Sequence, residues 1–251
     1  MALLREGRAF VPLRSVAEWM GAEVTYRKGV ITATRDTSVL LLAVGRDEAS
    51  IDGRIRALDA PPFRAGSLTF VPLRTFADAF GARVAYDAQR RIASIRDGGR
   101  EAEYYAFDHK PGWLPYMGAW FAVQYPAHLD VVEREKSGAG ERFDGVSFLA
   151  EDGTLELYVF SPQWRGESRW ARPWQGEREM SRSRSADGPR TRTQYTYQGP
   201  KGAYTRRFEQ IVDTESNTNH YFGIRFTDAR DPQQVESIYT RFKDSLEQYA
   251  D

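Results

Sequence analysis

The sequence predicts an α+β fold in two domains. An N-terminal domain, residues 1–97, is expected to contain duplicated strand–helix–strand units, and a C-terminal domain, residues 101–251, an antiparallel sheet covered by a helix. Three observations support this. The chain has 251 residues, more than the roughly 100 to 200 of one domain. The pentapeptide Phe-Val-Pro-Leu-Arg occurs twice, and strand-like segments fill a second half that ends in one amphipathic segment.

The duplication extends beyond the pentapeptide. Aligning residues 10–26 with residues 70–86 gives ten identities in seventeen positions at a constant offset of sixty. Such self-similarity indicates two copies of one structural unit.

Each copy predicts a strand, a short helix and a second strand. The proline of the pentapeptide suits the first turn of a helix, where its missing N–H leaves no bond unmade. In each copy a glycine, Gly21 or Gly81, comes directly after the residues with helical spacing. Glycine readily adopts the left-handed conformation that ends many helices. The two helices are expected to bury matching apolar faces: Leu13, Val16, Ala17 and Met20 in the first, and Leu73, Phe76, Ala77 and Phe80 in the second.

Between the copies, residues 30–34 and 39–44 are strand-like, and a turn follows at Asp52-Gly53. The doubled pattern of VPLR, a helix ending in Gly-Ala and a Val-x-Tyr strand resembles the N-terminal (stalk) domain of copper amine oxidases, over about residues 6–97. Members of that family usually begin with another strand and an Asn-Gly turn. Only Arg-Glu-Gly-Arg at residues 5–8 precedes the first copy, so we expect this sequence to begin inside the family's domain.

The resemblance implies an exported bacterial protein in which this domain supports another module. It does not imply copper, because residues 1–100 contain no His and no Cys. Residues 1–5 are too short for a secretory signal. The expected location is extracytoplasmic, in the cell envelope or secreted, with a signal peptide upstream of Met1.

The second half is expected to begin after a polar, glycine-containing boundary at residues 97–101. Its strand-like segments are residues 120–126, 146–149, 155–160, 191–198, 203–214 and 219–226. Asp231 and Pro232 suit the start of a helix. The apolar stripe of that helix would cover the sheet through Val235, Ile238, Tyr239, Phe242 and Leu246. This order is similar to the PsbP-like fold, whose members are mainly binding or assembly factors.

Composition argues against several kinds of chemistry. The chain has no Cys, which removes disulfides, thiolate metal sites and Cys nucleophiles. His109, His128 and His220 are scattered, and no metalloprotease, hydrolase, P-loop or dinucleotide-binding motif is present. The formal net charge is zero, which does not favour a dedicated nucleic-acid binder, and no apolar run is long enough to span a membrane. We therefore expect no enzyme, no metal and no cofactor.

One segment suggests a ligand-binding surface. Residues 161–210 carry eleven Lys and Arg against five Asp and Glu. Aromatic faces beside arginines suit sugar rings, bases or anionic polymers. The candidate ligand-binding residues are Trp164, Arg165, Arg169, Trp170, Arg172, Trp174, Arg182, Arg184 and Arg192. The competing interpretation is structural: the tryptophans hold a loop on the core, and the arginines form the wet face of a strand.

The sequence therefore predicts a non-enzymatic, exported cell-envelope protein. A stalk domain would support a C-terminal domain that binds a wall polysaccharide or an envelope protein. The alternative is a polyanion or nucleic-acid binder that uses residues 164–192.

Overall fold

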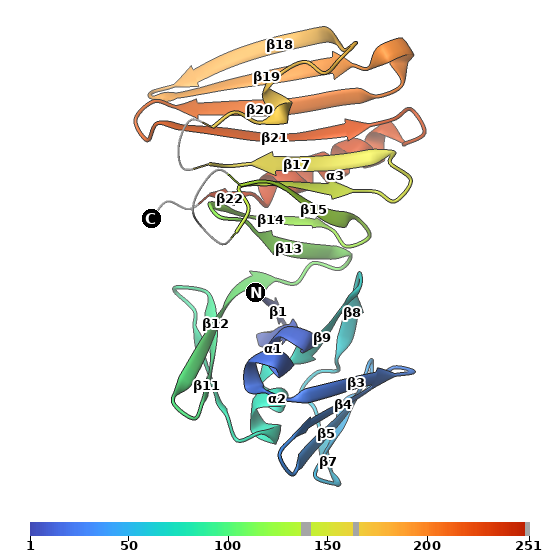
Figure 1. The fold of residues 1–251 in the computed structure, drawn as a ribbon, viewed down its shortest axis with the longest axis vertical. Helices are drawn as coiled ribbons and strands as arrows, with labels where there is room; N and C mark the ends of the chain where they lie inside the picture. Colours follow the sequence, from blue (N-terminus) through green and yellow to red (C-terminus); the bar gives the residue numbers. More distant parts are fainter. Residues whose placement is uncertain (137–141, 163–165, 249–251) are drawn as a thin grey trace. The chain divides into compact units, whose positions relative to one another are not determined.

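The computed structural model describes residues 1–136, 142–162 and 166–248. The chain divides into two compact units, residues 1–114 and 115–251, and each is described by itself (Figure 1). Both units combine β-sheets with short helices, which confirms the predicted α+β class.

The boundary between the units differs from the prediction. Residues 98 and 99 are a glycine turn with φ of +55° and +86°, joining β11 (Ile92–Asp97) to β12 (Arg100–Asp108). Two successive left-handed residues make the turn of a β-hairpin, which a glycine pair forms as readily as it forms a linker. β12 pairs with β11 and, in parallel, with β1 (Ala2–Arg5), so it continues the N-terminal sheet.

The two sequence copies fold as predicted. β2 (Arg8–Pro12), α1 (Leu13–Met20) and β3 (Glu23–Arg27) form the first unit. β9 (Leu68–Pro72), α2 (Leu73–Ala79) and β10 (Arg83–Asp87) form the second. β2 and β9 pair antiparallel, with Val11 opposite Val71 and each flanking phenylalanine opposite the other copy's proline. This symmetric register relates the two copies by an approximate two-fold axis.

The helices bury the expected faces with one exception. The four predicted residues of α1 are all buried, and so are the first three of α2. Phe80 is only partly buried because α2 ends at Ala79, which takes its place in the core.

Gly21 ends α1 in the left-handed conformation, with φ of +70°. Its N–H donates to the Glu18 carbonyl (3.1 Å), and the next N–H donates to the Ala17 carbonyl (2.9 Å), which is the Schellman pattern. A Cβ here would meet nothing within 4 Å, so Gly21→Ala tests backbone strain alone. We expect a loss of about 1–2 kcal/mol in the free energy of unfolding, measured by urea denaturation. Glu18→Ala, at an exposed helix position, should change it by less than about 0.5 kcal/mol; equal losses would contradict the argument.

A strand that the sequence analysis missed precedes the first copy. β1 forms a hairpin with β2 through Glu6 and Gly7, whose φ angles of +51° and +74° suit a tight hairpin turn. The four-residue strand buries both Ala2 and Leu3, so it lacks the alternation that marks a half-buried strand.

The N-terminal unit contains two sheets. One has the order β10-β11-β12-β1-β2-β9-β8, where β8 is Phe63–Ala65. The other has the order β3-β4-β5-β6-β7, with β4 (Val30–Arg35), β5 (Ser38–Ala43), β6 (Glu48–Ile51) and β7 (Arg54–Ala57). Both helices and both sheets contribute to one apolar core.

The C-terminal unit is built on a seven-stranded antiparallel sheet. Its strand order is β15 (Asp130–Glu135), β16 (Gly145–Leu149), β17 (Leu155–Phe160), β21 (Thr218–Phe226), β20 (Thr205–Asp213), β19 (Arg190–Gln198) and β18 (Arg178–Asp187). A smaller sheet joins β13 (Trp113–Met117), β14 (Phe121–Pro126) and β22 (Glu247–Gln248). The segments predicted as strands are confirmed, whereas β13, β15, β18 and β22 were not assigned from the sequence.

The closing helix α3 (Pro232–Asp244) covers one face of the large sheet (Figure 1). Asp231 caps it by accepting bonds from the next two free N–H groups, as predicted. Val235, Tyr239 and Phe242 are buried, and the ring of Phe242 lies 5.8 Å from that of Phe148 on β16. The helix ends before Leu246, which is only partly buried.

Candidate functional site

The face of the seven-stranded sheet opposite α3 has no helix of comparable length among the described residues. We call it the open face. Strand register places on it, in order across the sheet, Ser147, Glu156, Tyr158, Arg225, Arg206, Phe208, Tyr195, Tyr197, Arg182 and Arg184. Part of the loop between β17 and β18 crosses this face and includes the short 3₁₀ helix η1 (Arg169–Ala171) (Figure 1).

Trp170 attaches this loop to the sheet. Its side chain is completely buried and stacks on Tyr158, with ring centroids 4.8 Å apart. Gly223 on β21 leaves room for it, because a Cβ there would come within 2.9 Å of the indole ring. The predicted role of Trp170 as a ligand-stacking surface is therefore corrected: its ring is part of the core, as the structural interpretation held.

A buried ion pair lies next to Trp170. The side chains of Arg206 on β20 and Glu177 are both fully buried, with Arg206 Nε 2.8 Å from Glu177 Oε1. Arg206 also donates to the carbonyl oxygens of Trp170 (3.2 Å) and Arg172 (3.1 Å). Its guanidinium lies 4.6 Å from the ring centroid of Trp174. These contacts hold residues 170–177 of the loop on the sheet.

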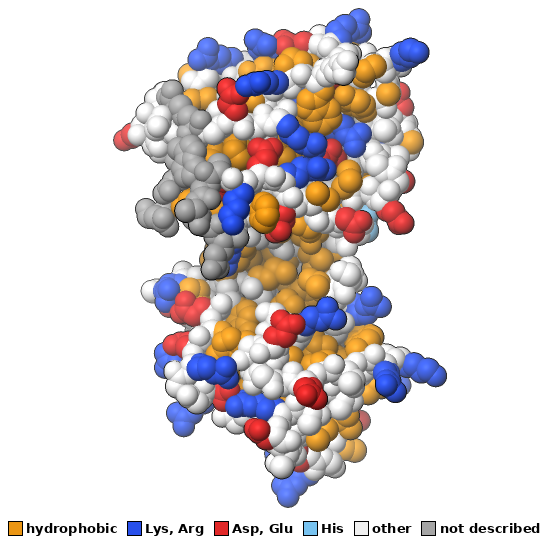
Figure 2. Space-filling model, in the orientation of Figure 1, with side chains coloured by type: hydrophobic (Ala, Val, Ile, Leu, Met, Phe, Trp, Pro, Cys, Tyr) orange, Lys and Arg blue, Asp and Glu red, His pale blue; other side chains and the backbone are white. Residues whose placement is uncertain are grey.

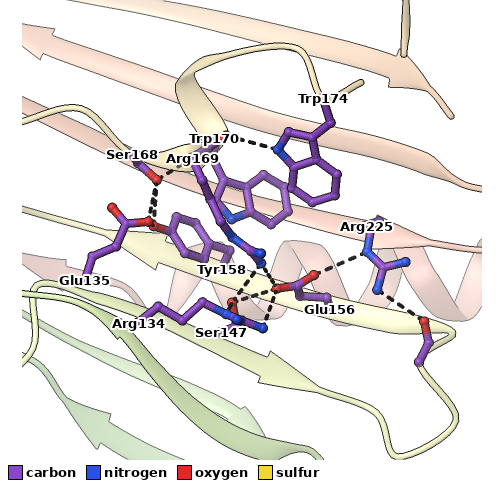
Figure 3. A network of polar contacts seen from close by, with 11 residues as sticks. Arg134, Glu135, Ser147, Glu156, Tyr158, Ser168, Arg169, Trp170, Trp174 and Arg225 are labelled. Atoms are coloured by element: carbon purple, nitrogen blue, oxygen red, sulfur yellow. Dashed lines mark hydrogen bonds and ion pairs between the residues drawn. The ribbon is translucent and has the colours of Figure 1, made fainter. Parts of the chain in front are cut away.

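Glu156 is the centre of a second polar cluster (Figure 3). Its carboxylate is almost fully buried and contacts three guanidinium groups, from Arg134 (3.6 Å), Arg169 and Arg225 (3.2 Å). Ser147 Oγ donates to it at 2.7 Å. Burial lowers the pKa of Arg169, even though Glu156 favours its charged form.

The arginines of this cluster are only partly covered. The side chains of Arg134, Arg169 and Arg225 are 29%, 38% and 18% exposed. Glu156 and the nearby Glu135 carry two negative charges against these three guanidinium groups, and the guanidinium fork matches carboxylates and phosphates. The cluster can therefore accept an anionic group from solution.

Beside it, the hydroxyl of Tyr158 contacts Glu135 and lies 2.6 Å from Ser168 Oγ (Figure 3). Burial is the main cause of the raised pKa of Tyr158, with the neighbouring carboxylate adding to it. Glu135 thereby fixes the tyrosine that stacks on Trp170.

The remaining predicted residues fall in different places. Trp164 and Arg165 lie outside the described residues. Trp174 is half-buried on the open face, and Arg172 is exposed beside Glu167. Arg182 and Arg184 are exposed on β18, and the Arg182 guanidinium lies 5.0 Å from the ring centroid of Tyr195. Arg192 lies on the opposite face, 3.3 Å from Glu209, and so is separated from the others.

Figure 2 shows hydrophobic and basic side chains next to one another on the C-terminal unit. Tyr195 and Tyr204 are partly exposed, and Arg182 and Arg172 are exposed. The open face thus combines a basic cluster with accessible aromatic rings. No pattern in the sequence indicated that Glu156 or Arg206 would lie on this face.

Two absences hold for the described part of the chain. No three His, Cys, Asp or Glu residues there are placed to hold a metal ion. No helix in the same ranges has the length and apolar character needed to cross a membrane.

A family model described as the copper amine oxidase N-terminal domain matches residues 1–95. Among solved structures, the chain is similar to cyanobacterial PsbP (CyanoP) from Synechocystis sp. PCC 6803, with 12% identity, a TM-score of 0.39, and coverage of 56% of this chain and 95% of that chain. It is also similar to a mutant of the protein Mog1, with 12% identity, a TM-score of 0.28, and coverage of 66% and 95%. No curated protein matches the sequence.

The family match confirms the resemblance based on the doubled VPLR motif, and the matched domain is non-catalytic in its family. Over its first 95 residues, the chain is thus similar to the N-terminal domain of copper amine oxidases.

Proposed function

We propose that the chain is an exported, non-catalytic binding protein of the cell envelope. Its N-terminal unit acts as a stalk, and the open face of its C-terminal unit binds an anionic wall polysaccharide. The observation that carries this proposal is the cluster of three partly exposed arginines around the single carboxylate of Glu156.

The neighbouring rings support a saccharide as the ligand class. Trp174 and Tyr195 offer partly exposed aromatic surface on the same face as Arg169. Amphipathic rings suit a ligand with apolar C–H faces, while guanidinium groups suit its carboxylate or phosphate substituents. The family match over residues 1–95 supports the role of the N-terminal unit as a stalk. It also supports export, because domains of this family usually occur in exported bacterial proteins.

Cosedimentation with purified cell walls tests this proposal. We expect the chain to sediment with walls that retain their anionic polymers and less with walls stripped of them, with binding that weakens as salt rises. Arg169→Gln should weaken binding about tenfold to a hundredfold, because a hydrogen bond to a charged group contributes about 1.5–3 kcal/mol.

Arg64→Gln is the matched control, since it removes the same charge at an exposed position on β8 of the other unit. Equal binding by the two variants, or no wall binding at low salt, would refute the proposal. Stronger binding to DNA than to walls, lost on replacing Arg182 and Arg184, would instead support the polyanion alternative.

A further inference from the structure

A cavity of about 790 Å³ lies on the other face of the same sheet, the face that α3 covers. Its floor comes from the ends of β18 to β21, and Trp120, Pro162 and Gln248 complete its wall. The volume is within the range of roughly 300 to 1,000 Å³ typical of small-molecule sites. None of its lining residues belongs to the polar cluster around Glu156.

The charged groups of this cavity are balanced. Arg190 Nε lies 2.8 Å from Asp213 Oδ2, and Arg192 Nη1 lies 3.3 Å from Glu209 Oε2. Asp213 also accepts two backbone N–H bonds, which fixes it in place. Arg190 and Arg192 line the cavity together with Asp187 and Asp213, so the lining has no net formal charge and favours a neutral ligand.

The cavity also presents a fixed neutral histidine. His220 Nδ1 lies 2.8 Å from Ser161 Oγ, and Nε2 lies 3.0 Å from Thr218 Oγ1. Burial lowers the pKa of His220 to about 4, so the ring is uncharged at neutral pH. Ser161 is completely buried and also accepts a bond from Gln248, so this pair is a rigid wall and not a nucleophile and its base.

The cavity lining includes both apolar and hydrogen-bonding residues. Trp120, Pro162 and Ile211 supply apolar surface, while Gln194 and the outer N–H groups of Arg190 supply hydrogen-bonding groups. A pyranose ring has the matching character, with apolar C–H faces and a rim of hydroxyl groups. We propose that this cavity is a second site, which binds a neutral saccharide independently of the open face.

Nuclear magnetic resonance of the indole N–H groups tests this inference on the full chain. The signal of Trp120 is identified by its loss in Trp120→Phe. Maltotriose, cellotriose and chitotriose are then added in turn at millimolar concentration. We expect at least one of them to shift the Trp120 signal while the Trp174 signal stays fixed, with an affinity that does not change with salt.

Gln194→Ala should weaken that binding about threefold to tenfold, as expected for one lost hydrogen bond. Gln89→Ala, at an exposed position in the N-terminal unit, is the control and should leave it unchanged. The inference is overturned if no trisaccharide moves the Trp120 signal, or if Gln194→Ala binds as the parent chain does. Wall binding through Arg169 is measured separately, so either proposal can fail without the other.

Discussion

Arg206→Ala is expected to lower the free energy of unfolding by about 3–5 kcal/mol, the usual cost of leaving a buried charge without its partner. Both side chains of the Arg206–Glu177 pair are fully buried. Burial alone would raise the pKa of Glu177, but hydrogen bonds from Arg206 and from the Trp174 N–H hold it below its ordinary value. Urea denaturation followed by tryptophan fluorescence measures the loss, because Trp170 and Trp174 border the pair.

Arg184→Ala provides the matched control. Arg184 is exposed on β18 of the same sheet, so its replacement should change stability by less than about 0.5 kcal/mol. The double variant Arg206→Met with Glu177→Leu should be more stable than Arg206→Ala, since it leaves neither charge buried alone. A loss in Arg206→Ala no larger than that in Arg184→Ala would show that the pair does not hold the loop.

The N-terminal unit was largely predictable because its signals are local and repeated. Pro12, the apolar spacing of α1 and Gly21 all favour the same helix, and the second copy repeats them. The elements that were not predicted are those without a local signal in the sequence. β1 is held by pairing with β2 and with β12, about a hundred residues away, and only the fold brings these strands together.

The candidate site was predicted in part. The sequence indicated that tryptophans and arginines gather after residue 160, and the structure brings Arg169, Trp170 and Trp174 together. The sequence could not show which guanidinium groups are buried. Arg206 and Arg207 are neighbours on β20, so they point to opposite faces, and only the partner on each face decides their roles.

β18 escaped assignment for a related reason. All ten of its residues are exposed, so neither face carries an apolar pattern. It is nonetheless paired along β19 from Arg178 to Asp187, with a bulge near Met180. Charged residues and a bulge are common on edge strands, where they discourage pairing with other chains. The alternating arginines therefore have a structural explanation in addition to the proposed role in binding.

Acidification is expected to destabilise the C-terminal unit through His220. Its pKa is lowered to about 4 by burial, whereas an unfolded histidine titrates near 6.5. The unfolded chain therefore binds a proton between these pH values that the folded chain refuses. Above about pH 6.5 the titration of His220 does not lower the free energy of unfolding. As the pH drops towards 4, it lowers that free energy by up to about 3 kcal/mol.

His220→Gln isolates this effect from the titration of carboxylates, which the variant shares with the parent chain. The difference in unfolding free energy between pH 7 and pH 4 should be smaller in His220→Gln by up to about 3 kcal/mol. His128→Gln, at an exposed position, should keep the full pH dependence of the parent. If His220→Gln kept it as well, the ring would have to be accessible to protons in the folded state. The bonds to Ser161 and Thr218 could then not hold it neutral in the cavity wall.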